Sequence, residues 1–134
     1  MRAWDLTLQL ENRAGAFAEL GEYLGSAGVN VEGVTACSND LSGQVHVVVR
    51  NRDAARTALK ESGLTILSEV EVVMTEVPNR PGTLGEYARR AASQGINLDC
   101  LYVGAGTYLL GGSAGKLDRL EQAWGTPVTT GTRN

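Results

Sequence analysis

The chain has no long apolar run and no block of positive charge. Its 134 residues carry 12 basic and 15 acidic side chains, a formal net charge of −3, so no cationic surface is available to neutralise phosphates. No stretch approaches the roughly 20 apolar residues that a membrane-spanning helix needs, and Asp5 soon follows Arg2 where a signal peptide would be apolar. We therefore expect a cytoplasmic protein that binds neither nucleic acid nor a membrane.

Chemically reactive side chains are also scarce. Cys37 and Cys100 have no cysteine or histidine at metal-ligand spacing, which excludes a local zinc site and a CxxC redox pair. His46 is the single histidine and has no neighbouring nucleophile motif. The glycines at 104–106 and 111–112 match neither GxGxxG nor a P-loop. The sequence thus predicts no catalytic residues, no metal site and no cofactor.

What the chain does contain is a repeat. The segment Asn12-Arg13-Ala14-Gly15 returns as Asn79-Arg80-Pro81-Gly82, an ungapped shift of 67 positions (79 minus 12). The same shift pairs Glu19 with Glu86, Ser26 with Ser93, Gly28 with Gly95 and Asn30 with Asn97. A hydrophobic core alone does not require polar Asn and turn-forming Gly at matching points. The repeat therefore predicts a duplicated small domain, with domains at 1–67 and 68–134, and its repeated polar loops predict repeated sites.

The first half has the hydrophobic periodicity of a βαββαβ unit. The predicted elements are a strand at Trp4–Leu10, a helix at Phe17–Ala27, strands at Val29–Val34 and Gln44–Arg50, a helix between Asn51 and Gly63, and a strand at Leu64–Leu67. Phe17 is expected on the apolar face of its helix, since it is spaced helically with Leu20 and Leu24. Asn51 is a suitable N-cap, and Gly28 stands where a left-handed C-terminal residue belongs.

The second half repeats this plan with a shorter hairpin. Its predicted elements are a strand at Val70–Val77, a helix at Leu84–Ala91, strands at Ile96–Val103 and Thr107–Leu110, a helix at Leu117–Trp124 with Ser113 as its N-cap, and a short last strand around Val128. No Gly or Pro interrupts Leu64–Val77, so the two halves should join almost directly. The fold class is α+β, with antiparallel sheets.

One strand of the second half is apolar on both faces. Val73 and Val77 face one side, while Val70, Val72 and Met74 face the other. Two explanations remain open: helices of the same chain cover the second face, or it is a subunit interface. We expect a homodimer or a higher homo-oligomer because small repeat units gain from shared burial.

The order strand, Asn-Arg-Pro-Gly-x-Leu, helix, Gly-Ile-Asn, strand resembles the ACT domain, the small amino-acid-sensing module of metabolic enzymes. The likeness covers essentially the whole chain as two tandem copies. It implies a ferredoxin-like βαββαβ fold and a non-enzymatic regulatory protein that binds a small-molecule effector, a free amino acid, and acts on a regulated enzyme or regulator in trans. The alternative is an interaction module that has kept the fold and lost ligand binding.

In serine-responsive ACT domains, the Asn of the turn and the Asn that opens the second strand hold the effector. The resemblance, together with the helix N-termini beside these turns, makes the candidate ligand-binding residues Asn79, Gly82, Thr83, Leu84 and Asn97 in the second half and Asn12, Gly15, Ala16 and Asn30 in the first. Amide groups at a helix N-terminus suit a carboxylate, and an Asn amide can bind either charged group of an amino acid.

The first copy departs from the pattern, because Ala14 stands where the second copy has Pro81. Proline would pre-set the turn before the helix, so the second half is expected to hold the better site. The competing interpretation is that each Asn only caps a turn or a helix end.

Overall fold

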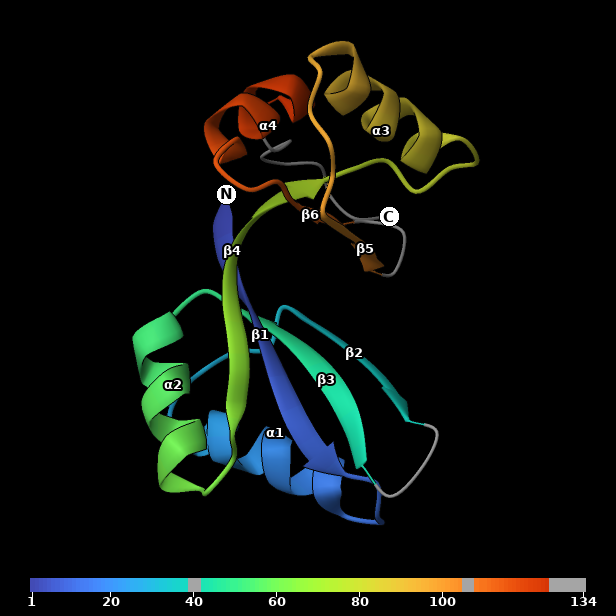
Figure 1. The fold of residues 1–134 in the computed structure, drawn as a ribbon. Coiled ribbons are helices and arrows are strands. Elements are labelled where there is room, and N and C mark those ends of the chain that lie inside the picture. The colour runs from blue at the N-terminus through green and yellow to red at the C-terminus, as the bar shows by residue number, and fades with distance from the viewer. Residues whose placement is uncertain (39–41, 105–107, 126–134) are drawn as a thin grey trace. The chain divides into compact units, whose positions relative to one another are not determined.

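The computed structural model describes residues 1–38, 42–104 and 108–125. The chain is an α+β protein whose hydrogen-bonded strands follow the order β2-β3-β1-β4-β6-β5 in these residues (Figure 1). It divides into an N-terminal unit, Ala3–Glu71, and a C-terminal unit that comprises Val72–Asn134 together with Met1–Arg2. Among the described residues, no helix combines the length and the apolarity that crossing a bilayer requires.

Two helices pack on one face of the strands in the N-terminal unit. The elements are β1 (Arg2–Glu11), α1 (Ala16–Ser26), β2 (Gly33–Ser38), β3 (Ser42–Val49) and α2 (Arg52–Glu61). Strand β3 pairs antiparallel with β1 and β2, which leaves β2 at the edge. The register sets Leu6 opposite Val47 and Leu8 opposite Val45, and all four side chains are buried with Leu20 and Leu24 of α1 and Leu59 of α2.

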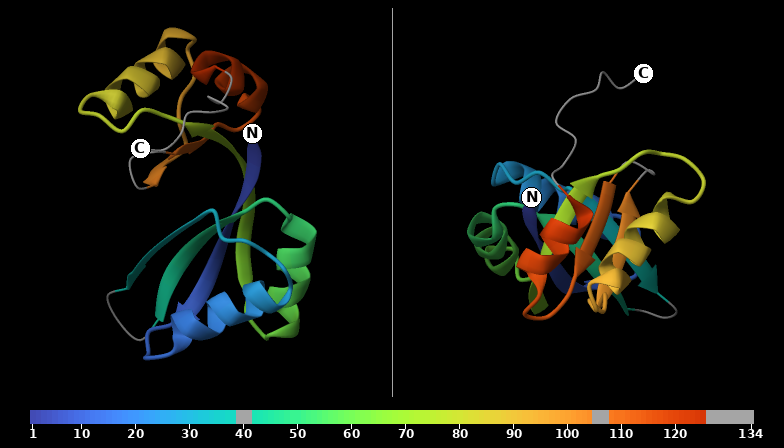
Figure 2. Two further views of the ribbon diagram at one scale, coloured as in Figure 1. Left: turned by 180° about the vertical axis from the view of Figure 1, so that it is seen from behind. Right: turned by 90° about the horizontal axis from the view of Figure 1, so that it is seen from above.

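The C-terminal unit has the same layering. Its elements are the end of β4 (Ile66–Glu76), α3 (Thr83–Ser93), β5 (Cys100–Gly104), β6 (Tyr108–Gly112) and α4 (Leu117–Trp124). Strand β6 pairs antiparallel with β4 and β5, and α3 and α4 lie side by side over these strands (Figure 2). Trp124 joins the layers, because it is buried against Val73 and its indole Nε1 donates to the carbonyl of Tyr87 at 3.0 Å.

Several local predictions are confirmed. Gly28 and Gly95 adopt φ of 71° and 68° just after α1 and α3. Asn51 caps α2, since its side chain accepts from the amide of Ala54 at 3.1 Å. The N-cap prediction for Ser113 is wrong, because α4 starts after Lys116 and has no side-chain cap.

The second strand of each half begins later than the periodicity predicts. The amide of Val29 bonds back to Leu24 at 2.9 Å, and the amide of Ile96 bonds back to Ala91 at 3.0 Å. These residues therefore close the preceding helix and fill the core, so that β2 starts at Gly33 and β5 at Cys100. Val128 lies outside the described residues.

The two strands predicted at Leu64–Leu67 and Val70–Val77 are one continuous strand, β4. Val72 and Met74 on its second face are buried in the single chain, and Val70 is exposed. This face therefore offers little surface to a second subunit. Val72 and Met74 do not belong to the core cluster that α3 and α4 form with Val73 and Val77.

Candidate ligand-binding site

Helices α1 and α3 begin in the same way. Gly15 and Gly82 occupy their N-cap positions with φ of 88° and 93°, a left-handed conformation that strains any residue with a Cβ. A glycine cannot supply a side-chain cap, and neither helix has one, whereas α2 is capped by Asn51. The first turns of α1 and α3 therefore keep amide donors that can bind an anion such as a carboxylate.

An ion pair ties each turn to the helix that follows it. Arg13 binds Glu19 with an N–O distance of 2.6 Å, and 67 positions on Arg80 binds Glu86 at 2.8 Å. Hydrogen bonds from Arg80, and then from Arg90, hold the pKa of Glu86 below its usual value. The guanidinium groups of both turn arginines are thus paired with glutamates of the helices that follow.

The second Asn of each copy lies beside an acidic residue. The side-chain amide of Asn30 donates to Glu32 at 3.3 Å, and that of Asn97 donates to Asp99 at 3.1 Å. All four residues are at least partly accessible. Glu32 and Asp99 are also 67 positions apart. The sequence comparison did not pair them because it matched only identical residues. Each pair presents an amide oxygen and a carboxylate, which suit an ammonium group.

The two Asn residues of one unit lie at opposite ends of one helix, since Asn79 precedes α3 and Asn97 follows it. The amide of Thr83 bonds to Arg80, which holds Asn79 near the start of α3, while the bond from Ile96 to Ala91 holds Asn97 near its end. The 11 residues of α3 span about 16 Å at the usual helical rise. Helix α1 separates Asn12 from Asn30 in the same way. The structure therefore does not bring the predicted pairs together within a unit.

The remaining predicted residues divide by exposure. Thr83 is buried, and its hydroxyl donates to the carbonyl of Pro78 at 2.7 Å, so it braces the turn. Ala16, at the same position of the first copy, is also buried. Leu84 is 49% exposed, and Phe17, its equivalent in the repeat, is 56% exposed. The prediction that Phe17 faces the core is wrong, because α1 packs on the core through Ala16, Leu20 and Leu24, and Phe17 does not belong to that cluster.

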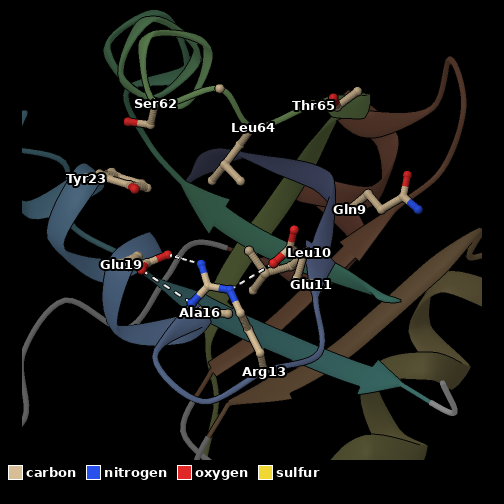
Figure 3. Close-up of a pocket in the computed structure, with 11 residues that line it drawn as sticks. Gln9, Leu10, Glu11, Arg13, Ala16, Glu19, Tyr23, Ser62, Leu64 and Thr65 are labelled. Atoms are coloured by element: carbon tan, nitrogen blue, oxygen red, sulfur yellow. Dashed lines mark hydrogen bonds and ion pairs between the residues drawn. The ribbon is translucent and has the colours of Figure 1, made fainter. Parts of the chain in front are cut away.

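Two hollows open beside the start of α1. The smaller, of about 100 Å³, is lined by Asn12, Phe17, Ala36 and Gln44 among others. The larger, of about 380 Å³, lies between the start of α1 and the end of α2 (Figure 3). We call it the acidic cleft, and its lining includes Glu11, Arg13, Glu19, Tyr23, Ser62 and Leu64. No cluster of metal-ligating side chains occurs among the residues that the structure describes.

Comparison with known proteins identifies the fold. Family models give no match to the chain, and neither do curated proteins. Among solved structures, protein BT0572 from Bacteroides thetaiotaomicron matches with a TM-score of 0.75 and 24% identity, over 92% of this chain and 86% of that one. The regulatory subunit of aspartate kinase from Thermus thermophilus matches with a TM-score of 0.67 and 14% identity, over 92% and 89%.

The chain thus has the tandem ACT-like fold of aspartate kinase regulatory subunits, which confirms the resemblance found in the sequence at the level of fold. Escherichia coli aspartokinase III, solved in complex with lysine and aspartate in its T-state, has a TM-score of 0.58 and 15% identity. Here the match spans 92% of this chain and 31% of the enzyme.

Proposed function

We propose that this chain is a non-enzymatic regulatory protein that binds a free amino acid through two tandem ferredoxin-like ACT domains, 1–67 and 68–134. The observation that carries the proposal is the pair of helix N-termini at Gly15 and Gly82, which share a left-handed glycine at the N-cap and no side-chain cap. An amino acid needs an anion site and an ammonium site. The repeated turns and the repeated Asn–acid pairs supply one of each.

The amide groups of the first helical turn bind the carboxylate of the ligand in this proposal. In the C-terminal unit they follow Gly82, with Asn79 beside them and the exposed Leu84 available for an apolar part of the ligand. The oxygen of the Asn97 amide and the carboxylate of Asp99 bind the ammonium group. Asn97 is already oriented for this task by its hydrogen bond to Asp99.

Because α3 separates Asn79 from Asn97, one amino acid cannot contact both within a single copy of the domain. We infer that the ligand lies between two chains, with the turn of one chain and the Asn–acid pair of the other. Exposed apolar side chains near the turns and the edge strand, which include Phe17, Val34 and Leu84, supply a surface for such an association. Ligand binding then stabilises a homodimer or a higher homo-oligomer.

The regulated protein acts in trans in this proposal. Regulatory subunits of aspartate kinase, of which the match covers 89% and 90%, have the same fold and support a regulatory role. A cytoplasmic location would give it access to the free amino acid pool. The exposed apolar residues also suit the alternative, an oligomerisation module without a ligand.

A thermal-shift screen against the twenty amino acids tests the proposal. A ligand at about a hundred times its Kd adds about 2.7 kcal/mol to the free energy of unfolding, a clear rise in Tm. Asn51→Ala is the control, because it removes the cap of α2 and lowers Tm without touching either site. If no amino acid raises Tm at millimolar concentration, the interaction module is the correct reading.

A further inference from the structure

The C-terminal unit contains a built-in cation at one position of the repeat. The guanidinium of Arg90 binds Glu86 at 2.7 Å and donates to the carbonyl of Trp124, the last residue of α4, at 3.5 Å. A carboxylate from the first helix and a carbonyl at the end of the second helix thus share one cation. The negative end of a helix dipole favours positive charge at this place.

The N-terminal unit keeps the carboxylate and lacks the cation. Glu19 is the equivalent of Glu86, but Tyr23 stands where Arg90 would be, 67 positions earlier. Helix α2 ends at Glu61, and the residues after it, Ser62 and Gly63, line the acidic cleft together with Glu19 and Tyr23 (Figure 3). The place that a guanidinium fills in one unit is therefore an open cleft of about 380 Å³ in the other.

The charges of the cleft favour a cation over an anion. Glu11 and Glu19 contribute two carboxylates and Arg13 one guanidinium, and the equivalent of Glu11 in the C-terminal unit is Pro78. Arg13 already donates to Glu11 at 2.8 Å and to Glu19 at 2.6 Å. An incoming anion would have to displace one of these carboxylates. A cation can instead use their remaining lone pairs.

We propose that the acidic cleft binds a small organic cation with a guanidinium group on a short aliphatic stem. The guanidinium lies against Glu19 and the C-terminal end of α2, as Arg90 lies against Glu86 and α4. The stem contacts Leu10 and Leu64, which line the same cleft. The cleft adjoins the turn of the first copy, because Arg13 and Ala16 line it, but its lining does not include Asn30. In the described part of the C-terminal unit, Arg90 supplies the cation at the equivalent position.

Calorimetric titration of the intact chain with butylguanidine tests the proposal, and butylurea, of the same shape without charge, is the matched ligand. We expect one saturable site per chain for butylguanidine and none for butylurea. Glu19→Gln should weaken binding by about tenfold or more, because it removes the charged partner. Glu86→Gln, at the equivalent position of the C-terminal unit, should leave the affinity unchanged.

Glu19→Gln could also release Arg13, which is paired with Glu19. Two further variants avoid this effect, because each places the residue of one copy at the equivalent position of the other. Tyr23→Arg supplies the cation from within the chain and should abolish binding, while Arg90→Tyr opens the second copy and should add a second, weaker site. An absence of saturable binding at millimolar butylguanidine would overturn the proposal. Equal binding of butylurea, or undiminished binding to Tyr23→Arg, would overturn it as well.

Discussion

Gly111 of β6 lies against the indole ring of Trp124. A Cβ at position 111 would overlap Cη2 of the ring and come within 3.3 Å of Cζ2 and Cζ3. The ring cannot move aside freely, because it is fully buried and its Nε1 donates to Tyr87. The absence of a side chain at Gly111 is therefore what allows the last residue of α4 to close the core of the C-terminal unit.

We expect Gly111→Ala to destabilise the protein by about 1–3 kcal/mol, the usual cost of overpacking a core. Denaturant unfolding measures this change. Gly21→Ala is the matched control, because Gly21 lies inside α1 with no atom within 4 Å of a new Cβ. It should stabilise the protein by up to about 1 kcal/mol through helix propensity. An unchanged stability of Gly111→Ala would mean that Trp124 is not held where the structure places it.

A second prediction concerns Thr75, whose buried hydroxyl has no hydrogen-bond partner among the described residues. We expect Thr75→Val to raise the free energy of unfolding by about 1 kcal/mol, because it removes an unsatisfied polar group from the core. Thr7→Val provides the contrast, since the Thr7 hydroxyl lies 3.2 Å from Nδ1 of His46. The second change should destabilise. Chemical unfolding measures both changes. If the free energy of unfolding changed in the same direction for both variants, the hydroxyl of Thr75 would not be the unpaired one.

The Arg56–Glu69 pair predicts a pH dependence. The Arg56 side chain donates to Glu69 from Nε at 2.7 Å and also from Nη2. These bonds hold the pKa of Glu69 below its usual value. A carboxyl whose pKa is lowered by folding stabilises the folded state above its unfolded pKa of about 4.3 and loses this effect as the pH falls through the folded pKa.

Glu69→Gln should therefore be less stable than the parent protein at pH 7 and nearly equal to it at pH 3. Salt should reduce the difference at pH 7, because the pair is partly exposed to solvent. Glu22→Gln, at an exposed position of α1, is the control. Urea unfolding at pH 7 and pH 3 measures the difference in the free energy of unfolding between Glu69→Gln and the parent protein. A difference that grows toward pH 3 would mean that folding raises the pKa of Glu69 and would contradict the prediction.

The repeat predicted local geometry well because several of its identical residues are glycines that the backbone conformation requires. Gly15 and Gly82 need a left-handed conformation, and Gly28 and Gly95 end their helices. A pattern of identical residues reports such needs directly. Strand limits were less predictable: Val29 is apolar both as a strand residue and as the residue that closes a helix, and only its bond to Leu24 distinguishes the two.

The site could be predicted only in part. The repeat singles out the turn and the second Asn of each copy as candidates, but the length of the intervening helix determines that they cannot meet within a unit. Arg90 and Tyr23 occupy one position of the repeat with different residues. A comparison that looks for identical residues does not reveal positions where the two copies differ. The acidic cleft could therefore be recognised only in the structure.

The last prediction ranks the two amino-acid sites. We expect the C-terminal copy to bind more tightly, because Pro81 stiffens its turn and less entropy is lost on binding than beside Ala14. Asn97→Ala should strongly reduce the ligand-induced rise in Tm, and Asn30→Ala should reduce it less. The loss of a polar partner leaves a charged group of the ligand unpaired, at a cost of about 1–3 kcal/mol.

The acidic neighbours sharpen this test. Asp99 accepts the amide of Ala114 at 2.7 Å and is thereby fixed beside Asn97, whereas Glu32 forms an ion pair with Arg50 at 3.1 Å. The charge of Arg50 opposes an ammonium group in the N-terminal copy, which favours the same ranking. Arg50→Gln should therefore strengthen the weaker site and leave the stronger one unchanged. If calorimetry finds that Asn30→Ala costs as much affinity as Asn97→Ala, the ranking is wrong.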